Sequence, residues 1–392
     1  MSRCQLREGA VKRVLLSAAA LLLVAACGTH DTPAAAPATS NPHSGHTAGS
    51  APPATPLRGG ERFVDLALPQ PYTPQAPNGG TDDYRCFLVD PGLTENAYLT
   101  GSQFQPQNAA IVHHAIFYRL DPRQATEAAK VDEQTPGEGW TCFGDAGVQG
   151  QTAWVAHWAP GAGETLMPSG SGFDMPPGSK LVMQVHYNLL ETGAAGQTDQ
   201  SGIKLRVAAA TSPLKSLSTD LFPAPIELPC AAGESGPLCD RDAAIADVGS
   251  RFGKEAGEQE KYLVEACSEG KVTAGDTQHC EQPVESAATI YMAAGHMHLL
   301  GRSIKIELNP GRPGAQTILD IPQYNFDNQA LVPLAKPIAV KPGDTVRVTC
   351  THDAKLRKML PQLQKLPPRY VVWGEGTSDE MCLGILVTAP TT

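Results

Sequence analysis

The sequence predicts a mainly β protein, and three observations carry that prediction. The 38 glycines and 34 prolines are spread along 392 residues, which favours short strands joined by turns over long helices. Short runs with alternating apolar residues recur between these turn residues. With 41% hydrophobic and 18% charged residues, the chain is long and apolar enough to form two globular domains.

The N-terminus has the composition of a secretory signal. Basic residues precede an apolar run, 14–26, that is too short to cross a bilayer as a helix. Small residues end this run directly before Cys27, as in the lipobox at which bacterial lipoproteins are cleaved and acylated. We therefore expect a signal peptide at 1–26 and an extracytoplasmic protein, lipid-anchored to a bacterial membrane through Cys27. A plain signal peptide with an incidental cysteine is the alternative.

Residues 27–60 are predicted to be a disordered tether. Pro, Ala, Ser, Thr and His dominate this stretch, which has hardly any large apolar side chain with which to bury surface. A flexible chain of this length would hold the body roughly 30 Å from the membrane.

The charge of the chain argues against one class of partner. There are 30 basic and 40 acidic residues, which give a formal net charge of -10. Because this charge repels phosphate backbones, we expect no nucleic-acid partner.

Eight cysteines lie in the predicted body, and an even number in an exported chain implies disulfides. They are Cys86, Cys142, Cys230, Cys239, Cys267, Cys280, Cys350 and Cys382. Free thiols or a zinc knot are the competing interpretations. The spacings are long and include no Cys-x-x-Cys pair, which disfavours a tetrathiolate zinc site.

Strand candidates follow the tether in order, each a short apolar run bounded by turn residues. They are 110–120, 180–190, 202–208, 289–299, 303–308, 344–351, 370–373 and 381–388. The exception is 240–267, where apolar residues recur at helical spacing between two cysteines, so we expect a helical insertion stapled by disulfides. The boundary between the two β bodies is predicted near 210–216, which gives domains at 61–212 and 213–392.

Two adjacent histidines, His113 and His114, stand in an otherwise apolar strand. Burying both imidazoles without partners would be costly, so they need hydrogen bonds or a metal. Neighbouring side chains on a regular strand point to opposite faces, so both can bind one ion only if the backbone bends or bulges there. Taken alone, the pair fits two core histidines bonded to carbonyls equally well.

The strand at 180–190 alternates between an apolar face and a polar face. Gln184, His186 and Asn188 form the polar face. A solvent-facing strand would also show this pattern, but His186 can supply a third imidazole to the first pair. Neutral imidazoles suit copper or zinc.

His296 and His298 form the most specific metal signal. Residues two apart on a strand project from the same face, roughly 6.5–7 Å apart at the backbone. Both rings can then reach one ion at about 2.0 Å, although two histidines on a wet strand face would look the same. Near the C-terminus, Met381 offers a thioether, which binds Cu(I) well and zinc poorly, so a His-His-Met set would select copper. Alone, Met381 fits an ordinary core residue.

Six segments together resemble the copper type II, ascorbate-dependent monooxygenases in order and rough spacing. They are 82–86, 112–114, 184–187, 295–301, 343–350 and 378–382. The resemblance covers about 80–388 and implies two jelly-roll-like β-sandwiches that face each other across a cleft. It also implies that Cys350 pairs with Cys382.

The resemblance assigns a role to each candidate ligand. His113, His114 and His186 would hold an electron-transfer copper on the first domain, while His296, His298 and Met381 would hold the copper that binds O2 and substrate on the second. Gln184 would lie on a polar path between them. The implied reaction hydroxylates an activated C-H bond with O2 and a one-electron reductant such as ascorbate, and the second oxygen atom leaves as water.

The sequence departs from the peptide-amidating branch of that family where the branch grips its substrate. Ala294, Leu383 and Ile385 stand at those positions, so we expect a small neutral or apolar substrate. A non-catalytic copper-binding or carrier lipoprotein is the main alternative. A zinc hydrolase is a third and would leave Met381 without a role. Three further histidines are expected to be structural or surface residues: His157, His279 and His352.

Overall fold

The computed structural model describes residues 52–190, 193–211 and 214–391. In the first half of this part, the strands are β1 (Glu61–Ala67), β2 (Asp82–Val89), β3 (Ala97–Gln105), β4 (Val112–Leu120), β5 (Trp140–Thr141), β6 (Ala153–Trp158), β7 (Thr165–Leu166), β8 (Ser171–Met175), β9 (Lys180–Asn188), β10 (Gly202–Ala209) and β11 (Lys215–Ser216). One helix, α1 (Pro122–Gln134), interrupts them. The predicted signal peptide and the acylated Cys27 lie outside the described residues.

The strands of the second half are β12 (Ser218–Pro223), β13 (Thr277–Pro283), β14 (Ala288–His296), β15 (Gly301–Leu308), β16 (Gln316–Ile321), β17 (Val332–Val340), β18 (Thr345–His352) and β19 (Leu383–Pro390). Its helices are α2 (Arg241–Phe252), α3 (Lys254–Ser268) and the short α4 (Leu356–Met359). Two 3₁₀ turns, Pro77–Gly79 and Pro237–Cys239, complete the elements. None of the described helices is long and apolar enough to cross a membrane.

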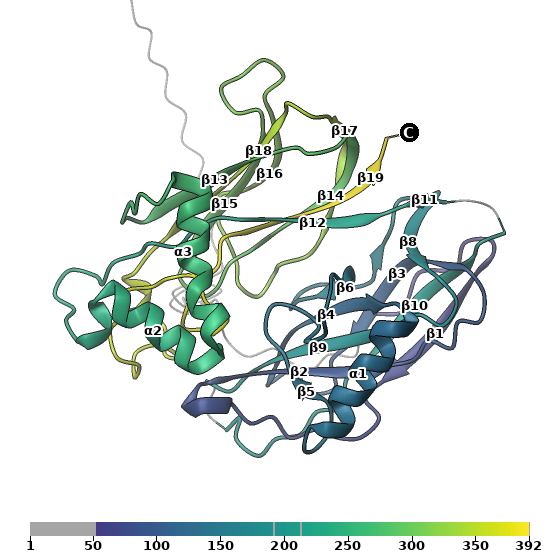
Figure 1. Cartoon of the computed structure of the whole chain (residues 1–392), viewed down its shortest axis with the longest axis horizontal. Helices are drawn as coiled ribbons and strands as arrows, with labels where there is room; N and C mark the ends of the chain where they lie inside the picture. Colours follow the sequence, from purple (N-terminus) through teal and green to yellow (C-terminus); the bar gives the residue numbers. More distant parts are fainter. Residues whose placement is uncertain (1–51, 191–192, 212–213, 392) are drawn as a thin grey trace, which may run out of the picture. The chain divides into compact units, whose positions relative to one another are not determined.

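Each half is a β-sandwich of two sheets (Figure 1). The first sandwich pairs a sheet in the order β5-β2-β9-β4-β6 with one in the order β1-β10-β3-β8-β11, where β7 is added beside β3. The second pairs β12-β19-β14-β17 with β13-β18-β15-β16. The predicted all-β fold is therefore confirmed. The chain passes from the first sandwich to the second between β11, which pairs with β8, and β12, which pairs with β19.

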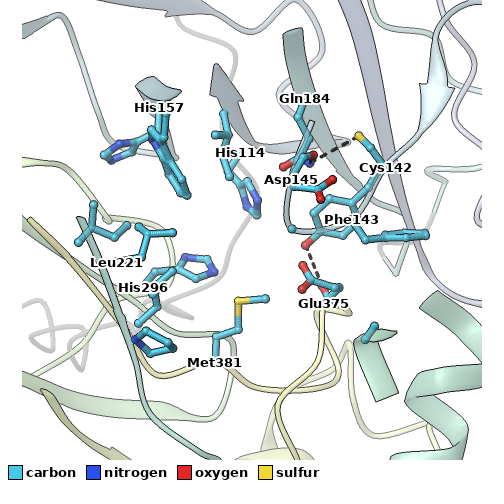
Figure 2. A pocket seen from close by; sticks show the side chains of 18 of the residues that line it. His114, Cys142, Phe143, Asp145, His157, Gln184, Leu221, His296, Glu375 and Met381 are labelled. Atoms are coloured by element: carbon cyan, nitrogen blue, oxygen red, sulfur yellow. Dashed lines mark hydrogen bonds between the residues drawn. The ribbon is translucent and has the colours of Figure 1, made fainter. Parts of the chain in front are cut away.

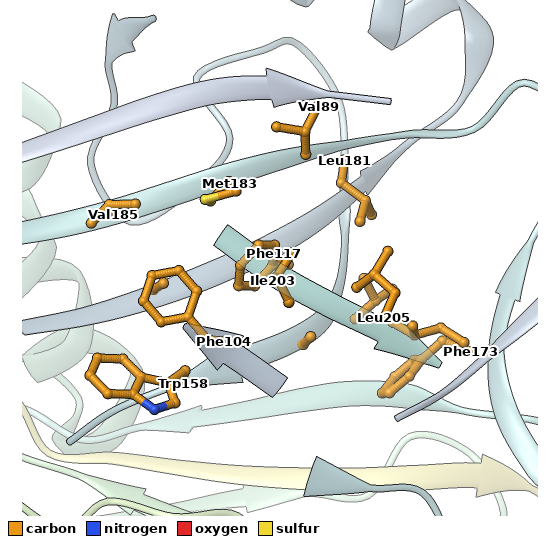
Figure 3. Packing of buried hydrophobic residues seen from close by; sticks show 14 of the residues in the cluster. Val89, Phe104, Phe117, Trp158, Phe173, Leu181, Met183, Val185, Ile203 and Leu205 are labelled. Atoms are coloured by element: carbon orange, nitrogen blue, oxygen red, sulfur yellow. The ribbon is translucent and has the colours of Figure 1, made fainter. Parts of the chain in front are cut away.

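The alternation predicted for 180–190 sets the core of the first sandwich. Leu181, Met183 and Val185 of β9 pack in the same core as Ile203 and Leu205 of β10 (Figure 3). The other face of β9 is thereby left to the polar residues that belong to the candidate site.

The helical insertion is confirmed, and it is stapled at both ends. One disulfide joins Cys230 to Cys239 before α2, and another joins Cys267, in the last turn of α3, to Cys280 of β13. Gly253, with a φ of 99°, separates the two helices, which is a backbone conformation that favours glycine. By contrast, α1 was not predicted, although Asp121 and Gln124 form a capping box at its start.

Three strand predictions need correction. Residues 370–373 form only single bridges, Leu228 with Val371 and Trp373 with Glu380, because their backbone groups bond to several different segments. The strand predicted at 289–299 ends at His296, and the one at 381–388 begins at Leu383.

The predicted tether is too long at its C-terminal end. The buried side chain of Arg206 donates hydrogen bonds to the carbonyl oxygens of Thr55 and Pro56. It also pairs with Glu61 and Glu164. Residues 52–60 are thus held against the first sandwich by a charged group that would otherwise be buried without enough partners.

Candidate metal centres

Three of the predicted ligands, His113, His114 and His186, converge in the first sandwich. The Nδ1 atoms of His113 and His114 are 3.0 Å apart, and those of His186 and His114 are 3.3 Å apart. All three side chains are buried, and one ring nitrogen from each lies within 4.8 Å of the others. The pairing of β4 with β9 shifts register between Val112 and His114, which confirms that the backbone is irregular where two adjacent histidines must face one point.

The geometry of this first set fits a metal ion. Nitrogens that bind one ion at about 2.0 Å lie roughly 3.3–3.5 Å from one another. The Nε2 atom of His186 is 2.8 Å from Oδ1 of the buried Asp82, so an Nε2–H donor leaves the Nδ1 lone pair for the ion. Burial, followed by His186 and His113, holds the pKa of His114 well below its ordinary value, so this imidazole is neutral, as a ligand must be.

His296 and His298 come together in a different way from the predicted one. Their ring centroids are 5.2 Å apart, but β14 ends at His296 and His298 lies in the turn that follows. The backbone N–H of His298 donates to the side chain of Glu380 at 2.9 Å instead of to a neighbouring strand. The expectation that both histidines stand on one regular strand was therefore wrong.

The second set also presents uncommitted nitrogens. The Nδ1 atom of His296 is 2.5 Å from Oε1 of Gln329, and that of His298 is 3.3 Å from the carbonyl oxygen of Asp379. The Nε2 atom of His298 is buried without a hydrogen-bond partner among the described residues. Burial lowers the pKa of His296 to about 3 and also lowers that of His298. A buried neutral nitrogen with no partner fits a metal better than it fits a core.

Met381 lines a cavity of about 640 Å³ together with His296 (Figure 2). Its neighbour Cys382 is bonded to Cys350 of β18, the pairing that the resemblance implied. The thioether is therefore attached to a fixed backbone beside the second histidine set. Imidazole and thioether donors together suit Cu(I).

The cavity brings the two histidine sets to one place. His114 of the first set lines it, and its ring centroid is 5.5 Å from that of His296. Phe326 stacks on His113 at 4.1 Å and lies 6.4 Å from the ring of His298. The two predicted sites are thus neighbours in this structure, and residues of both sandwiches line the cavity that they share.

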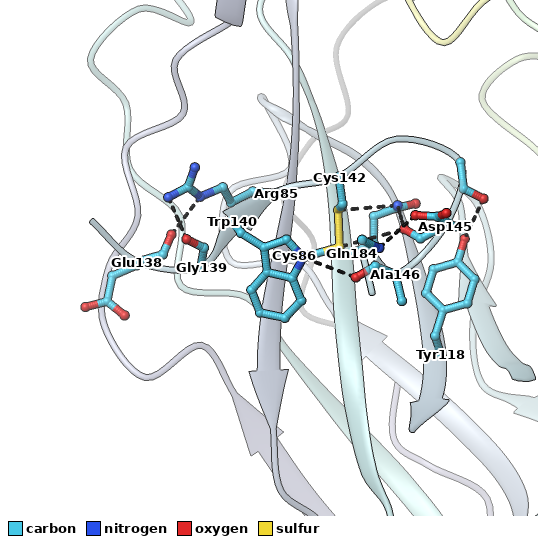
Figure 4. The surroundings of a disulfide bond; sticks show 12 residues. Arg85, Cys86, Tyr118, Glu138, Gly139, Trp140, Cys142, Asp145, Ala146 and Gln184 are labelled. Atoms are coloured by element: carbon cyan, nitrogen blue, oxygen red, sulfur yellow. Dashed lines mark hydrogen bonds between the residues drawn. A yellow bond between two sulfur atoms is a disulfide. The ribbon is translucent and has the colours of Figure 1, made fainter. Parts of the chain in front are cut away.

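Gln184 lines the same cavity, beside the disulfide between Cys86 and Cys142 (Figure 4). Its Nε2 donates to the carbonyl oxygen of Asp145 at 2.7 Å and lies 3.5 Å from Sγ of Cys142. These contacts fix the amide at the cavity, while its predicted place on a polar path stays a prediction.

Sequence reasoning missed several residues at the site. His157 was expected to be structural or on the surface, but it lines the cavity (Figure 2), and burial lowers its pKa to about 4. The residues that hold the ligands were also missed, because their partners come from distant segments: Asp82, Gln329, Asp379 and Glu380. Only their place in the sequence could have indicated a role at the site, since Asp82 and Glu380 lie inside segments that carried the family resemblance.

Two buried sets of imidazole nitrogens at one cavity, one set beside a thioether, have the donor chemistry of a metal-binding protein built on a double β-sandwich. Residues 268–390 match the family described as "Copper type II ascorbate-dependent monooxygenase, C-terminal domain". This match, together with the similarity to the relatives below, supports the copper type II, ascorbate-dependent monooxygenase family for this chain.

Three relatives show how far the similarity extends. The chain is 24% identical over 88% of its length to a peptidylglycine alpha-amidating monooxygenase of Rattus norvegicus, covering 28% of that protein. It is 24% identical over 84% of its length to a tyramine beta-hydroxylase of Caenorhabditis briggsae (49% covered) and 27% identical over 61% to a dopamine beta-hydroxylase of Bos taurus (33% covered). The chain thus spans less than half the length of each of these relatives.

Asp82→Asn should weaken copper binding at the first histidine set by about tenfold. The amide can still accept the hydrogen bond from His186, but it lacks the charge that strengthens the imidazole as a ligand. Competition with a Cu(I) chelator measures the change. Asp83→Asn is the matched control, because Asp83 bonds to Tyr72 and Gln75 instead. Equal affinities in Asp82→Asn and the wild type would contradict the proposed orientation of His186.

The copper-free protein should lose stability as the pH falls below about 6.5. The folded-state pKa is about 4 for His157 and about 3 for His296, so the unfolded state binds more protons between these values and about 6.5. At pH 5 each histidine would then lower the free energy of unfolding by about 2 kcal/mol. Urea unfolding at pH 7 and pH 5 tests this. In His157→Phe the loss should shrink by about 2 kcal/mol, and an unchanged loss would refute the assignment.

Proposed function

We propose that this protein is a copper-dependent monooxygenase that hydroxylates an activated C-H bond of a small substrate with O2 and a one-electron reductant such as ascorbate. The observation that carries the proposal is the pair of buried histidine sets on one cavity, only one of which is joined by a thioether. Copper bound there would supply one-electron redox chemistry and the reaction with O2.

The residues of the chain prepare both sites for that chemistry. Asp82 orients His186, while Gln329 and the carbonyl oxygen of Asp379 orient His296 and His298. Because the ligands are held before an ion arrives, little reorganisation is needed on binding.

The cavity favours a substrate with an apolar body. Ala294, Leu383 and Ile385 line it, as expected from their positions beside the ligands. Six aromatic side chains extend this surface: Tyr84, Phe143, Trp154, Trp158, Phe252 and Trp373.

The charges of the cavity favour a cationic group at one end of that substrate. Asp145, Glu255 and Glu375 line it, and no lysine or arginine does so among the described residues. Burial, then Asp379 and Asp145, raises the pKa of Glu375 to about 7, as expected for a carboxylate without a cation nearby. We therefore propose a protonated amine with an apolar body. This revises the expected neutral substrate, and two of the relatives are named for amines.

We also propose that the protein works on the extracytoplasmic side of a bacterial membrane, anchored at Cys27. Four disulfides are formed among the described residues, and such bonds persist in oxidising compartments. Labelling with radioactive palmitate, lost in Cys27→Ser, would test the anchor.

The purified protein should bind two coppers per chain and consume O2 with ascorbate only when copper and an amine substrate are both present. His113→Ala and His296→Ala should each retain one copper, as measured by elemental analysis. Oxygen uptake that is not coupled to substrate, with two coppers bound, would favour a carrier protein. One copper per chain, or zinc in preference to copper, would overturn the two-site proposal.

Glu375→Gln should weaken binding of tyramine, used as a probe amine, by about ten- to hundredfold, the range expected for loss of a charge-assisted hydrogen bond. Binding of tyrosol, its neutral alcohol analogue, should hardly change. Since the anionic carboxylate binds the amine, wild-type affinity should rise as the pH rises through about 7, and the variant should lose this rise. Calorimetric titration measures both, with Glu258→Gln, a change at an exposed residue of α3, as the control. Equal losses for amine and alcohol would contradict a charge contact.

A further inference from the structure

Glu380, which directly precedes Met381, has a fully buried side chain whose carboxylate accepts three backbone N–H groups. The donors are His298 at 2.9 Å, Leu300 at 2.6 Å and Met381 at 3.2 Å. Two of these donors belong to the turn after β14, and the third belongs to the segment before β19. One side chain therefore joins the two segments that carry the predicted ligands of the second set.

The β-sheet cannot join these two segments by backbone hydrogen bonds. The ladder between β14 and β19 ends where His296 pairs with Leu383. Beyond it, His298 and Met381 lie outside regular strands, so their backbone N–H groups have no partners in the ladder. A buried N–H without a partner costs about as much as a lost hydrogen bond, and the carboxylate of Glu380 replaces the missing strand.

The carboxylate of Glu380 has a buried histidine as its neighbour. The Nε2 atom of His352, another buried side chain, lies 3.4 Å from Oε2 of Glu380. Although burial alone raises it, the pKa of Glu380 is lowered by His352 and His298. A carboxylate oxygen accepts N–H groups more strongly than a neutral oxygen does.

We propose that Glu380 is a positioning residue for the second copper site: its carboxylate fixes the distance between His298 and Met381, so that imidazole and thioether can bind one ion. This inference rests on the proposed copper site. The disulfide from Cys382 fixes the backbone beside Met381 only on one side. Glu380 connects it to the histidine turn, and a shift of about half an ångström there would already degrade a metal site.

The test compares Glu380→Gln with Glu260→Gln in the full-length protein. Glu260 serves as the control, because its carboxyl group is also buried in the same half of the chain. It accepts the backbone N–H groups of Ile226 and Trp373. In Glu380→Gln, the amide group can accept through one oxygen only and turns its NH2 group toward a backbone donor.

Two measurements follow. In the copper-free protein, amide hydrogen exchange at His298, Leu300 and Met381 should be at least tenfold faster in Glu380→Gln and unchanged in Glu260→Gln. In the Cu(I)-loaded protein, X-ray absorption should lose the copper-sulfur scattering, and Cu(I) affinity at the second set should fall at least tenfold while the first set stays filled.

Glu380→Asp keeps the charge but is one methylene shorter, so it should show the same losses and serves if Glu380→Gln does not fold. Unchanged exchange and unchanged copper-sulfur scattering in the folded variant would overturn the positioning role. Equal effects in Glu260→Gln would overturn it too, because they would show a general loss of stability. A wild-type protein without copper-sulfur scattering but with faster exchange in the variant would refute the copper site and leave the contact of Glu380 with the turn established.

Discussion

The buried carboxylate of Asp82 is the contact on which the arrangement of both sites depends. It accepts Nε2–H of His186 in the first sandwich and the backbone N–H and hydroxyl of Thr377 from the second. Tyr84 repeats this link, since its ring stacks on His186 at 4.1 Å and its hydroxyl donates to the carbonyl oxygen of Glu375. Because these groups are buried, separating the sandwiches would leave charged and polar atoms without partners. The orientation of the first set and the path of the chain toward Met381 are thereby coupled.

In both histidine sets, a protein oxygen contacts one ring nitrogen of a histidine and leaves the other nitrogen for an ion, but the two sets differ in which nitrogen is contacted. In the first, Nδ1 atoms converge and Nε2 of His186 is held by a carboxylate. In the second, the Nδ1 atoms of His296 and His298 are held by neutral oxygens, and their Nε2 atoms remain. A carboxylate makes an imidazole a stronger donor and so favours Cu(II), whereas neutral partners and a thioether favour Cu(I). The partners of the ligands, and not only the ligands, therefore distinguish the sites.

Local sequence could predict those features that local physics decides. Alternation placed Leu181, Met183 and Val185 in the core and His186 on the other face, because a strand has a period of two. Adjacent histidines can bind one ion only from an irregular strand, and β4 is irregular there. The errors concern features that depend on distant partners. Residues 370–373 have the composition of a strand, but their backbone groups bond to several segments instead of one ladder. His298 leaves its strand because Glu380, remote in sequence, accepts its N–H.

The helical insertion shows how a feature outside the sandwiches can determine what the site binds. Its two disulfides fix α2 and α3, which bring Phe252, Glu255 and Gln259 to the cavity. Glu255 of the insertion and Glu375 both line the cavity. Burial, then Asp379 and Asp145, raises the pKa of Glu375 to about 7, because no cation among the described residues lies beside this carboxyl group. Such a group is destabilising unless something neutralises it, either a proton or a cation. An ammonium ion that displaces the proton would gain a charge-assisted hydrogen bond in a buried setting, where it is stronger than in water. For the proposed amine substrate, this energetic disadvantage would become selectivity for the charged group, while the apolar residues beside the histidines would contact its carbon skeleton.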